Sequence, residues 1–301
     1  MPDRHPHLDR LAIVLVVACS FLWGLNQVAV KGIVHEVPPL VQATIRSLLG
    51  AVLVLAWALA RGIPMWRRDG TLAGGLVAGA LFGGEFACVF LGLQYTTASR
   101  MIVFIYIAPF VVALGMPFIS RAERLAAHQV GGLLLAFSGV ALAFAEGFTQ
   151  PEAGPRQWLG DTLGVVAAVL WGATTLAIRA TPLASAAPEK TLVYQLGVSG
   201  ALLLAGSLAH GDAWTVALSA TAWASLGYQS VVVVFVSYLV WFWLVRHYQA
   251  TQLSAFTLLT PVFGLMLGVF VLGEPVTMRL VAALAGVVAG IALVNRRRAA
   301  A

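Results

Sequence analysis

The chain has 301 residues, of which 60% are hydrophobic and only 10% are charged. A water-soluble domain ordinarily carries about 25% charged residues, so this composition favours a protein whose solvent is lipid. The net charge of +6 comes from scattered basic residues rather than from a basic stripe with interleaved aromatic side chains, and it gives no support to nucleic-acid binding.

Apolar segments follow one another along the whole chain. A helix needs about 20 apolar residues to cross a bilayer, and breaks at charged residues, Gly and Pro separate ten candidate spans. They are residues 9–34, 38–60, 71–95, 98–119, 127–146, 158–180, 189–209, 221–246, 251–272 and 276–295. The first resembles a secretory signal up to Cys19, but its apolar run is too long for a removable one. The sequence therefore predicts an all-α integral membrane protein with ten transmembrane helices.

The chain also repeats itself. Residues 20–26, which contain Trp23 and Gly24, reappear 148 positions later as residues 168–174. A second match, shifted by 152 positions, relates Ala98-Ser99 and Pro109 to residues 250–251 and Pro261. These matches predict a first repeat over residues 1–146, a linker over 147–157 and a second repeat over 158–301. Because five spans per repeat is an odd number, the second repeat enters the membrane from the opposite side, and the two repeats are inverted.

The basic residues between the spans predict the orientation. With the N-terminus inside, four basic residues fall outside, namely Lys31, Arg100, Arg156 and Arg279. Thirteen fall inside, namely Arg4, Arg10, Arg61, Arg67, Arg68, Arg121, Arg124, Arg179, Lys190, Arg246, Arg296, Arg297 and Arg298. Cytoplasmic loops are enriched in Lys and Arg, so both termini are expected in the cytoplasm.

The sequence carries no signature of an enzyme. It has no GxSxG, HExxH or P-loop motif. Cys19 and Cys88 lie in apolar runs without a CxxC or a His pair, which argues against a zinc cluster and a disulfide scaffold. We therefore expect no catalytic residues, no metal and no cofactor.

Two ionisable residues lie deep inside predicted spans. Arg46 is about nine residues into the second span, and Glu85 is near the middle of the third. Such groups cost several kcal/mol and usually face a cavity or a partner. They could pair with each other and hold the helices together, or contact a substrate or a coupling proton. Their repeat equivalents are uncharged, with Tyr194 matching Arg46 and Tyr238 near the position that matches Glu85.

Other candidate substrate contacts are aromatic or polar residues well inside their spans. Trp23 and Trp171 occupy equivalent positions and are followed by Asn26 and Thr174. They either pack where the repeats meet or line a cavity. Phe104 and Tyr106 lie on the fourth span near Pro109.

Pro109 and its equivalent Pro261 lie mid-span and tend to kink their helices. They are either fixed kinks or paired hinges. Gly75, Gly79 and Gly83 recur at four-residue spacing in the third span, which indicates a packing seam between helices.

Four short motifs carry a resemblance to a known family. They are Trp-Gly-x-Asn at residues 23–26, Ala-Ser at 98–99 followed by Pro109, Ala-Glu-Arg at 122–124 and Gly-Glu-Pro at 273–275. With these motifs in this order, the chain resembles EamA-type members of the drug/metabolite transporter superfamily and is similar to bacterial aromatic amino-acid exporters. One departure is that Ala122 stands where the second repeat keeps Gly273.

The resemblance implies an inner-membrane secondary transporter that exports small amphipathic metabolites by alternating access, with a central cavity between the repeats. Amino acids, aromatic ones in particular, are the favoured substrates, because Arg46 could bind a carboxylate and Glu85 an ammonium. The alternative is a proton-coupled multidrug or organic-cation pump in which Glu85 is the cation and proton site. A channel and an intramembrane enzyme are further alternatives. Ten spans suffice to enclose a cavity within a monomer.

Overall fold

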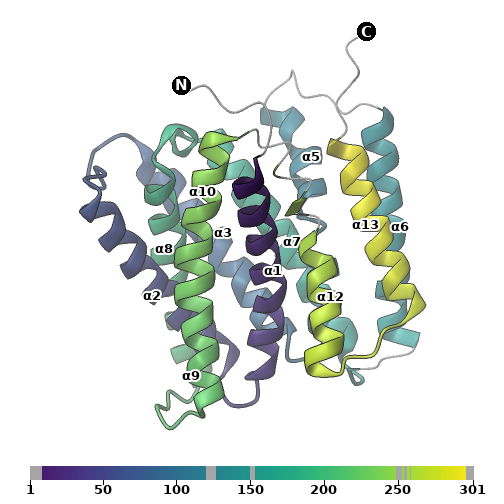
Figure 1. Cartoon of the computed structure of the whole chain (residues 1–301). Coiled ribbons are helices and arrows are strands. Elements are labelled where there is room, and N and C mark those ends of the chain that lie inside the picture. Colours follow the sequence, from purple (N-terminus) through teal and green to yellow (C-terminus); the bar gives the residue numbers. More distant parts are fainter. Residues whose placement is uncertain are drawn as a thin grey trace.

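The computed structural model describes residues 9–119, 127–149, 153–248, 253, 256, 257 and 259–295, and the elements within these ranges are helices. They form one bundle in which long helices run between two ends (Figure 1). We call the end at which α1 begins the upper end. The opposite end, at the bottom of Figure 1, is the lower end.

The first half of the chain contains α1 (Arg10–Gly32), α2 (Pro39–Ala60), α3 (Thr71–Gly92), α4 (Ala98–Ile105), α5 (Ala108–Ile119) and α6 (Ala127–Thr149). The second half contains α7 (Gln157–Ala180), the short 3-10 helix η1 (Pro182–Ser185), α8 (Pro188–His210), α9 (Ala220–Gly227), the π-helix η2 (Tyr228–Ser237), α10 (Tyr238–His247), α12 (Leu259–Leu272) and α13 (Met278–Asn295).

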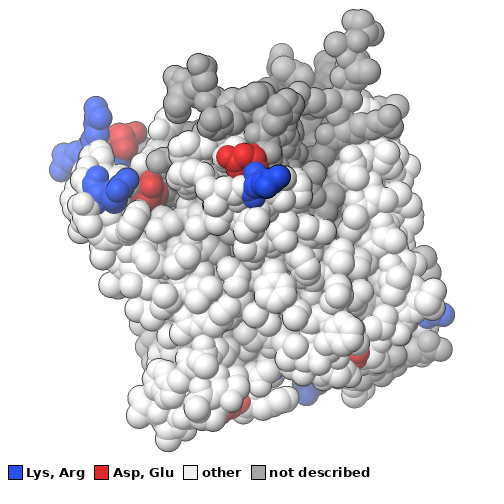
Figure 2. Space-filling view, in the orientation of Figure 1, with Lys and Arg blue, Asp and Glu red and all other residues white. Residues whose placement is uncertain are grey.

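Seven helical segments of the described chain are long and apolar enough to cross a membrane. α4 with α5 forms one of them, and α9 to α10 forms another. Shorter apolar helices lie at 130–139, Leu259–Leu272 and Met278–Leu293, within the other three predicted spans. Charged side chains gather at the two ends of the face in Figure 2, with an uncharged band between them. The protein is therefore an all-helical membrane protein, and the count of ten spans stays a prediction.

Two spans are irregular at mid-depth. The span 98–119, expected as one helix, is interrupted at Tyr106 and Ile107, between α4 and α5. Pro109 follows this break and has no N–H to donate to the carbonyl of Ile105, which favours an interruption here. The span 220–247 contains η2, whose wider turns are not visible in the hydrophobic pattern.

The two Trp-Gly motifs make equivalent contacts across the halves. A Cβ on Gly24 of α1 would lie 2.8–3.0 Å from the backbone and side chains of Thr260, Phe263 and Gly264 in α12. A Cβ on Gly172 of α7 would lie within 3.2 Å of Val111 and the Ala108 carbonyl in α5. Each half therefore packs its first helix against the Pro-containing span of the other half, and only glycine allows this approach.

Candidate functional site

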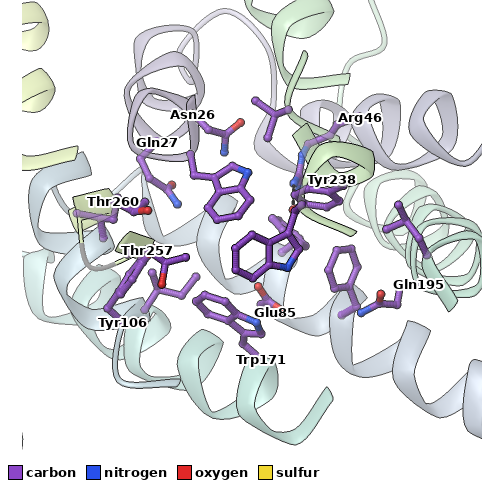
Figure 3. Close-up of a pocket in the computed structure, with 18 of the residues that line it drawn as sticks. Asn26, Gln27, Arg46, Glu85, Tyr106, Trp171, Gln195, Tyr238, Thr257 and Thr260 are labelled. Atoms are coloured by element: carbon purple, nitrogen blue, oxygen red, sulfur yellow. Dashed lines mark hydrogen bonds between the residues drawn. The ribbon is translucent and has the colours of Figure 1, made fainter. Parts of the chain in front are cut away.

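A cavity of about 330 Å³ lies between helices of both halves. Figure 3 shows its labelled polar residues around a space that is otherwise bounded by aromatic and aliphatic side chains. The lining residues are Trp23, Asn26, Gln27, Arg46, Phe82, Glu85, Phe86, Ile102, Ile105, Tyr106, Pro109, Trp171, Leu192, Gln195, Val233, Tyr238, Trp241, Phe242, Thr257 and Thr260.

Most of the predicted substrate contacts lie on this cavity. They are Trp23, Asn26, Arg46, Glu85, Tyr106, Trp171 and Tyr238, and the predicted hinge Pro109 lies there too. The break between α4 and α5 therefore forms part of the wall, as non-helical backbone in a membrane protein is tolerated where it lines a cavity. The second predicted hinge, Pro261, is buried near the start of α12.

Three predicted contacts lie elsewhere. Phe104 packs against Arg100, whose guanidinium carbon lies 5.6 Å from the centroid of the Phe104 ring. The Thr174 hydroxyl donates to the Leu170 carbonyl within its own helix, at 2.8 Å. The Tyr194 ring packs against Gly75, where an added Cβ would lie 2.5 Å from it. This contact places Gly75 of the predicted packing seam on the α3–α8 interface.

Several lining residues were not singled out from the sequence. Gln27 follows Asn26 directly, and Phe86 follows Glu85, so proximity to the predicted residues was their only signal. Gln195 follows Tyr194, another predicted contact, and had the same signal. Trp241 carries no such signal, because an aromatic residue inside a span indicates a cavity no better than it indicates a helix interface.

Arg46 is 1% exposed and projects from α2. Its Nη2 donates to the Tyr238 hydroxyl at 3.2 Å, and its guanidinium carbon lies 3.9 Å from the centroid of the Phe86 ring. Its Nε and Nη1 are buried without a hydrogen-bond partner. A desolvated cation over an aromatic face is stabilised by about 2 kcal/mol or more. This contact does not satisfy the Nε and Nη1 donors, so two donors of this cation remain unused.

Glu85 is 4% exposed and projects from α3. Its Oε2 is also buried without a hydrogen-bond partner. Arg46 and Glu85 do not pair directly, since the salt bridges between described residues involve other side chains. The cavity therefore presents a cationic and an acidic side chain, both buried and neither neutralised by direct contact with the other.

Aromatic rings are fixed around this pair. The Trp23 indole N–H donates to the Ser237 hydroxyl at 2.9 Å, and its ring packs edge-on against Trp241 at 5.4 Å. Trp171 packs edge-on against Tyr106 at 6.0 Å. The hydrogen bond from Trp23 to η2 and these edge contacts hold flat apolar surfaces toward the cavity.

Glu274 joins the two halves at the lower end. Its carboxylate accepts from the backbone N–H of Ala98 at 2.6 Å and of Ser99 at 2.9 Å, at the start of α4. A carboxylate at a helix N-terminus is favoured by the unpaired N–H groups and by the helix dipole. Gly273, with φ of +65°, turns the chain so that Glu274 reaches this position. The equivalent motifs, residues 122–124 and 250–251, lie outside the described residues.

A buried ionic cluster lies beside this contact. Arg100 of the first half pairs with Glu146 at 2.9 Å and with Asp161 of the second half at 2.6 Å. Thr96 donates to the same Asp161 at 2.6 Å, and the Lys31 ammonium donates to the Thr96 carbonyl at 2.9 Å. α4 runs from the lower end, and its later residues Ile102 and Ile105 line the cavity. The cluster around Arg100 therefore lies between the cavity and the lower end.

Asp69 and Lys190 join the halves at the upper end. The ammonium of Lys190 contacts the Asp69 carboxylate at 2.8 Å and the Arg67 carbonyl at 3.0 Å. Hydrogen bonds from Lys190 and from the Thr71 hydroxyl hold the pKa of the Asp69 carboxyl well below its usual range. This carboxylate therefore stays ionised at physiological pH.

Comparison with known proteins identifies related chains. The model of the EamA-like transporter family matches residues 10–145 and 158–296. An uncharacterized transporter of Bacillus subtilis, YvbV, is 30% identical over 94% of this chain and 91% of its own length. A protein of Escherichia coli named a probable amino-acid metabolite efflux pump is 28% identical over 90% of each chain. A solved crystal structure superposes with a TM-score of 0.66 at 20% identity, over 94% of this chain and 95% of the other.

Proposed function

Since this chain belongs to the EamA-like transporter family, we propose that it is an inner-membrane secondary transporter that exports small amphipathic metabolites. Amino acids are the favoured substrates, aromatic ones in particular. The probable amino-acid metabolite efflux pumps of Escherichia coli and Salmonella typhimurium, both related along most of the chain, support this substrate class.

The observation that carries the proposal is the pair formed by Arg46 and Glu85. Both side chains are buried at one cavity without pairing with each other. A charge in a membrane-spanning helix costs about 3 kcal/mol or more, and such charges are retained where a ligand uses them. A zwitterion offers both complements, because its carboxylate can accept from Arg46 while its ammonium donates to Glu85.

The size of the cavity favours one small substrate. Ligand pockets span roughly 300–1,000 Å³, so a cavity of about 330 Å³ suits a single amino acid better than a large drug. The rings of Trp23, Trp171 and Trp241 supply apolar surface for an aromatic or aliphatic side chain.

Alternating access would expose this cavity to each end in turn. By the charge count, the lower end faces the outside and both termini face the cytoplasm. The contacts of Glu274 and Arg100 join the halves at the lower end, and we infer that they stabilise its closed state. Pro109 and Pro261 are the hinges that we propose, since each lies in a span packed against the first helix of the other half.

The arrangement of helices supports two inverted repeats in a monomer, with residues 147–157 as the linker between residues 1–146 and 158–301. Lys31 near the end of α1 and Asp161 near the start of α7 both contact the lower-end residue Thr96. α1 therefore ends at the end of the bundle where α7 begins, as inversion requires.

A proton-coupled multidrug or organic-cation pump is the second candidate. A buried carboxyl surrounded by Trp, Tyr and Phe rings suits an organic cation, and the carboxyl could exchange that cation for a proton. Arg46 in the same cavity disfavours this alternative, because a cationic substrate would meet a like charge.

Counterflow in proteoliposomes distinguishes the two candidates. Vesicles loaded with an unlabelled amino acid should take up the same labelled amino acid against its gradient, and aromatic amino acids should give the largest signal. Empty liposomes and protein with Arg46→Met are the controls. Movement of a cationic dye, without amino-acid exchange and dependent on the proton gradient, would replace this proposal with the second candidate.

A further inference from the structure

The cavity contains a polar region that the charged pair does not use. Asn26 and Gln27 project into it from α1, and they are 6% and 8% exposed. The side-chain oxygens Oδ1 of Asn26 and Oε1 of Gln27 are buried without a hydrogen-bond partner. Leaving a buried acceptor unsatisfied costs about 1–3 kcal/mol, so two neighbouring ones call for a partner.

The two carboxamides and the charged pair come from different helices around the cavity. Arg46 and Glu85 belong to α2 and α3, which pack against α8, whereas Asn26 and Gln27 belong to α1, which packs against α12. Figure 3 shows Gln27 on the side of Thr260, away from Glu85 and Gln195, and Asn26 between Gln27 and Arg46. A ligand held by Arg46 and Glu85 at one end would extend past Asn26 toward Gln27.

Other polar groups on that side differ in whether they have partners. The Tyr106 hydroxyl donates to the Thr257 carbonyl at 3.3 Å, whereas Oγ1 of Thr260 is buried without a hydrogen-bond partner. The Trp23 N–H, one helical turn before Gln27, is bonded to Ser237. The carboxamide oxygens of Asn26 and Gln27, together with the Thr260 hydroxyl oxygen, are therefore acceptors left for a ligand on this side of the cavity.

We propose that Asn26 and Gln27 select substrates whose side chain ends in a hydrogen-bond donor, such as the indole N–H of tryptophan or the hydroxyl of tyrosine. This inference rests on the proposed amino-acid transport and assigns the far end of the substrate. A site built to bond a substrate N–H or O–H discriminates against an analogue that lacks it, because its own polar groups are then left unpaired.

Competition in the counterflow assay measures this preference with pairs of compounds that differ at the donor. Tyrosine should compete roughly 5- to 10-fold more strongly than phenylalanine, as expected for one hydrogen bond. Tryptophan should likewise exceed 1-methyltryptophan, in which the N–H is blocked.

Variants then assign the preference to these residues. Asn26→Leu with Gln27→Met should bring the tyrosine-to-phenylalanine ratio to about one through weaker tyrosine binding, with an unchanged melting temperature in detergent as evidence of folding. Gln195→Met removes a carboxamide from the opposite wall and should leave the ratio unchanged. A ratio near one in the unaltered protein, or an unchanged ratio in the double variant, would overturn the inference. If neither amino acid is exchanged by the unaltered protein, the proposed function fails and this inference fails with it.

Discussion

At the scale of single residues, the strongest features are charges that the fold buries without direct neutralisation. Arg46 keeps one hydrogen bond, to Tyr238, and a stacking contact with Phe86. Glu85 is buried within the same cavity. Charged residues that serve stability alone would be expected to pair with each other. We therefore interpret Arg46 and Glu85 as a binding site at which the protein gives up some folding stability for affinity.

Replacing Arg46 tests whether the protein gives up folding stability for substrate binding. Arg46→Met should reduce amino-acid counterflow more than ~10-fold, because the carboxylate loses a charge-assisted partner. Thermal stability in detergent should be retained or raised, because a buried, incompletely paired charge is replaced by an apolar side chain of similar length. Initial exchange rates and the melting temperature measure the two effects. Full exchange in this variant would rule out Arg46 as the carboxylate site.

The Asp69–Lys190 contact gives a prediction about pH. The pKa of Asp69 is lowered in the folded state, so its stabilising contribution is present above the unfolded pKa of about 4 and is lost as the pH falls through the folded pKa. Asp69→Asn should therefore lower the melting temperature at about pH 7, and the difference should narrow below about pH 4.

The partner variant Lys190→Met provides the control for this prediction. In its background, Asp69→Asn should lose most of its effect on the melting temperature, since the ammonium that lowers the pKa is gone. An effect of Asp69→Asn that is unchanged by Lys190→Met would show that the contact is not responsible.

At the scale of elements, the main device is the carboxylate of Glu274 at the N-terminus of α4. It brings together two motifs, Gly-Glu-Pro and Ala-Ser, that are separate in the sequence. An added Cβ on Gly268 would lie 2.3 Å from the Ser99 hydroxyl and 2.5 Å from Glu274, so α12 approaches this contact closely. We infer that the contact stabilises closure of the lower end.

Glu274→Gln should weaken that closure. The amide keeps the shape but loses the charge that the two N–H groups and the helix dipole favour. In protein without its native cysteines, Met101→Cys should become several-fold more reactive toward a membrane-impermeant maleimide added at the outer face, because Met101 is fully buried behind the contact.

Glu36→Gln is the matched control, because Glu36 accepts from Ser219 at the same end but is exposed. Its effect on labelling should be smaller, since exposed contacts contribute little. Equal labelling in the two variants would contradict a specific role for Glu274.

The sequence predicted part of this fold and site, and the limits have physical causes. Apolar length located the seven long helical segments of the described chain, and a charge inside such a run is unusual enough to single out Arg46 and Glu85. The interruption at Tyr106 and the π-helix η2 depend on backbone hydrogen bonds that hydrophobicity does not report. Tyr194 was inferred from its repeat position, yet its ring fills the space over Gly75, because two diverged halves do not use equivalent residues equally.

At the scale of the whole molecule, the two halves exchange equivalent contacts. α1 packs against α12 as α7 packs against α5, while α2 pairs with α8 and α6 with α13. A bundle built from two such halves can move one half against the other around the central cavity, which is the usual basis of alternating access.

The proposed inversion predicts the sides to which the connections are exposed. In protein without Cys19 and Cys88, single cysteines at His35 and Ala213 should react with an impermeant maleimide from outside intact cells. Cysteines at Arg61 and Ser185 should react only after the cells are opened. If the cysteines at His35 and Arg61 were accessible from the same side, there would be no span between them. If all four cysteines were accessible from the side opposite to the predicted one, the orientation would be inverted.

The most direct test of the central claim varies the two charged ends of one substrate. Phenylalanine carries both charges. Its methyl ester and phenethylamine carry only the cation, and its N-acetyl derivative carries only the anion. If a zwitterion bridges Arg46 and Glu85, phenylalanine should compete for counterflow at least ~10-fold better than each derivative, since each loses a charge-assisted hydrogen bond. Competition by phenethylamine equal to that of phenylalanine would contradict the account and identify the cavity as a site for organic cations.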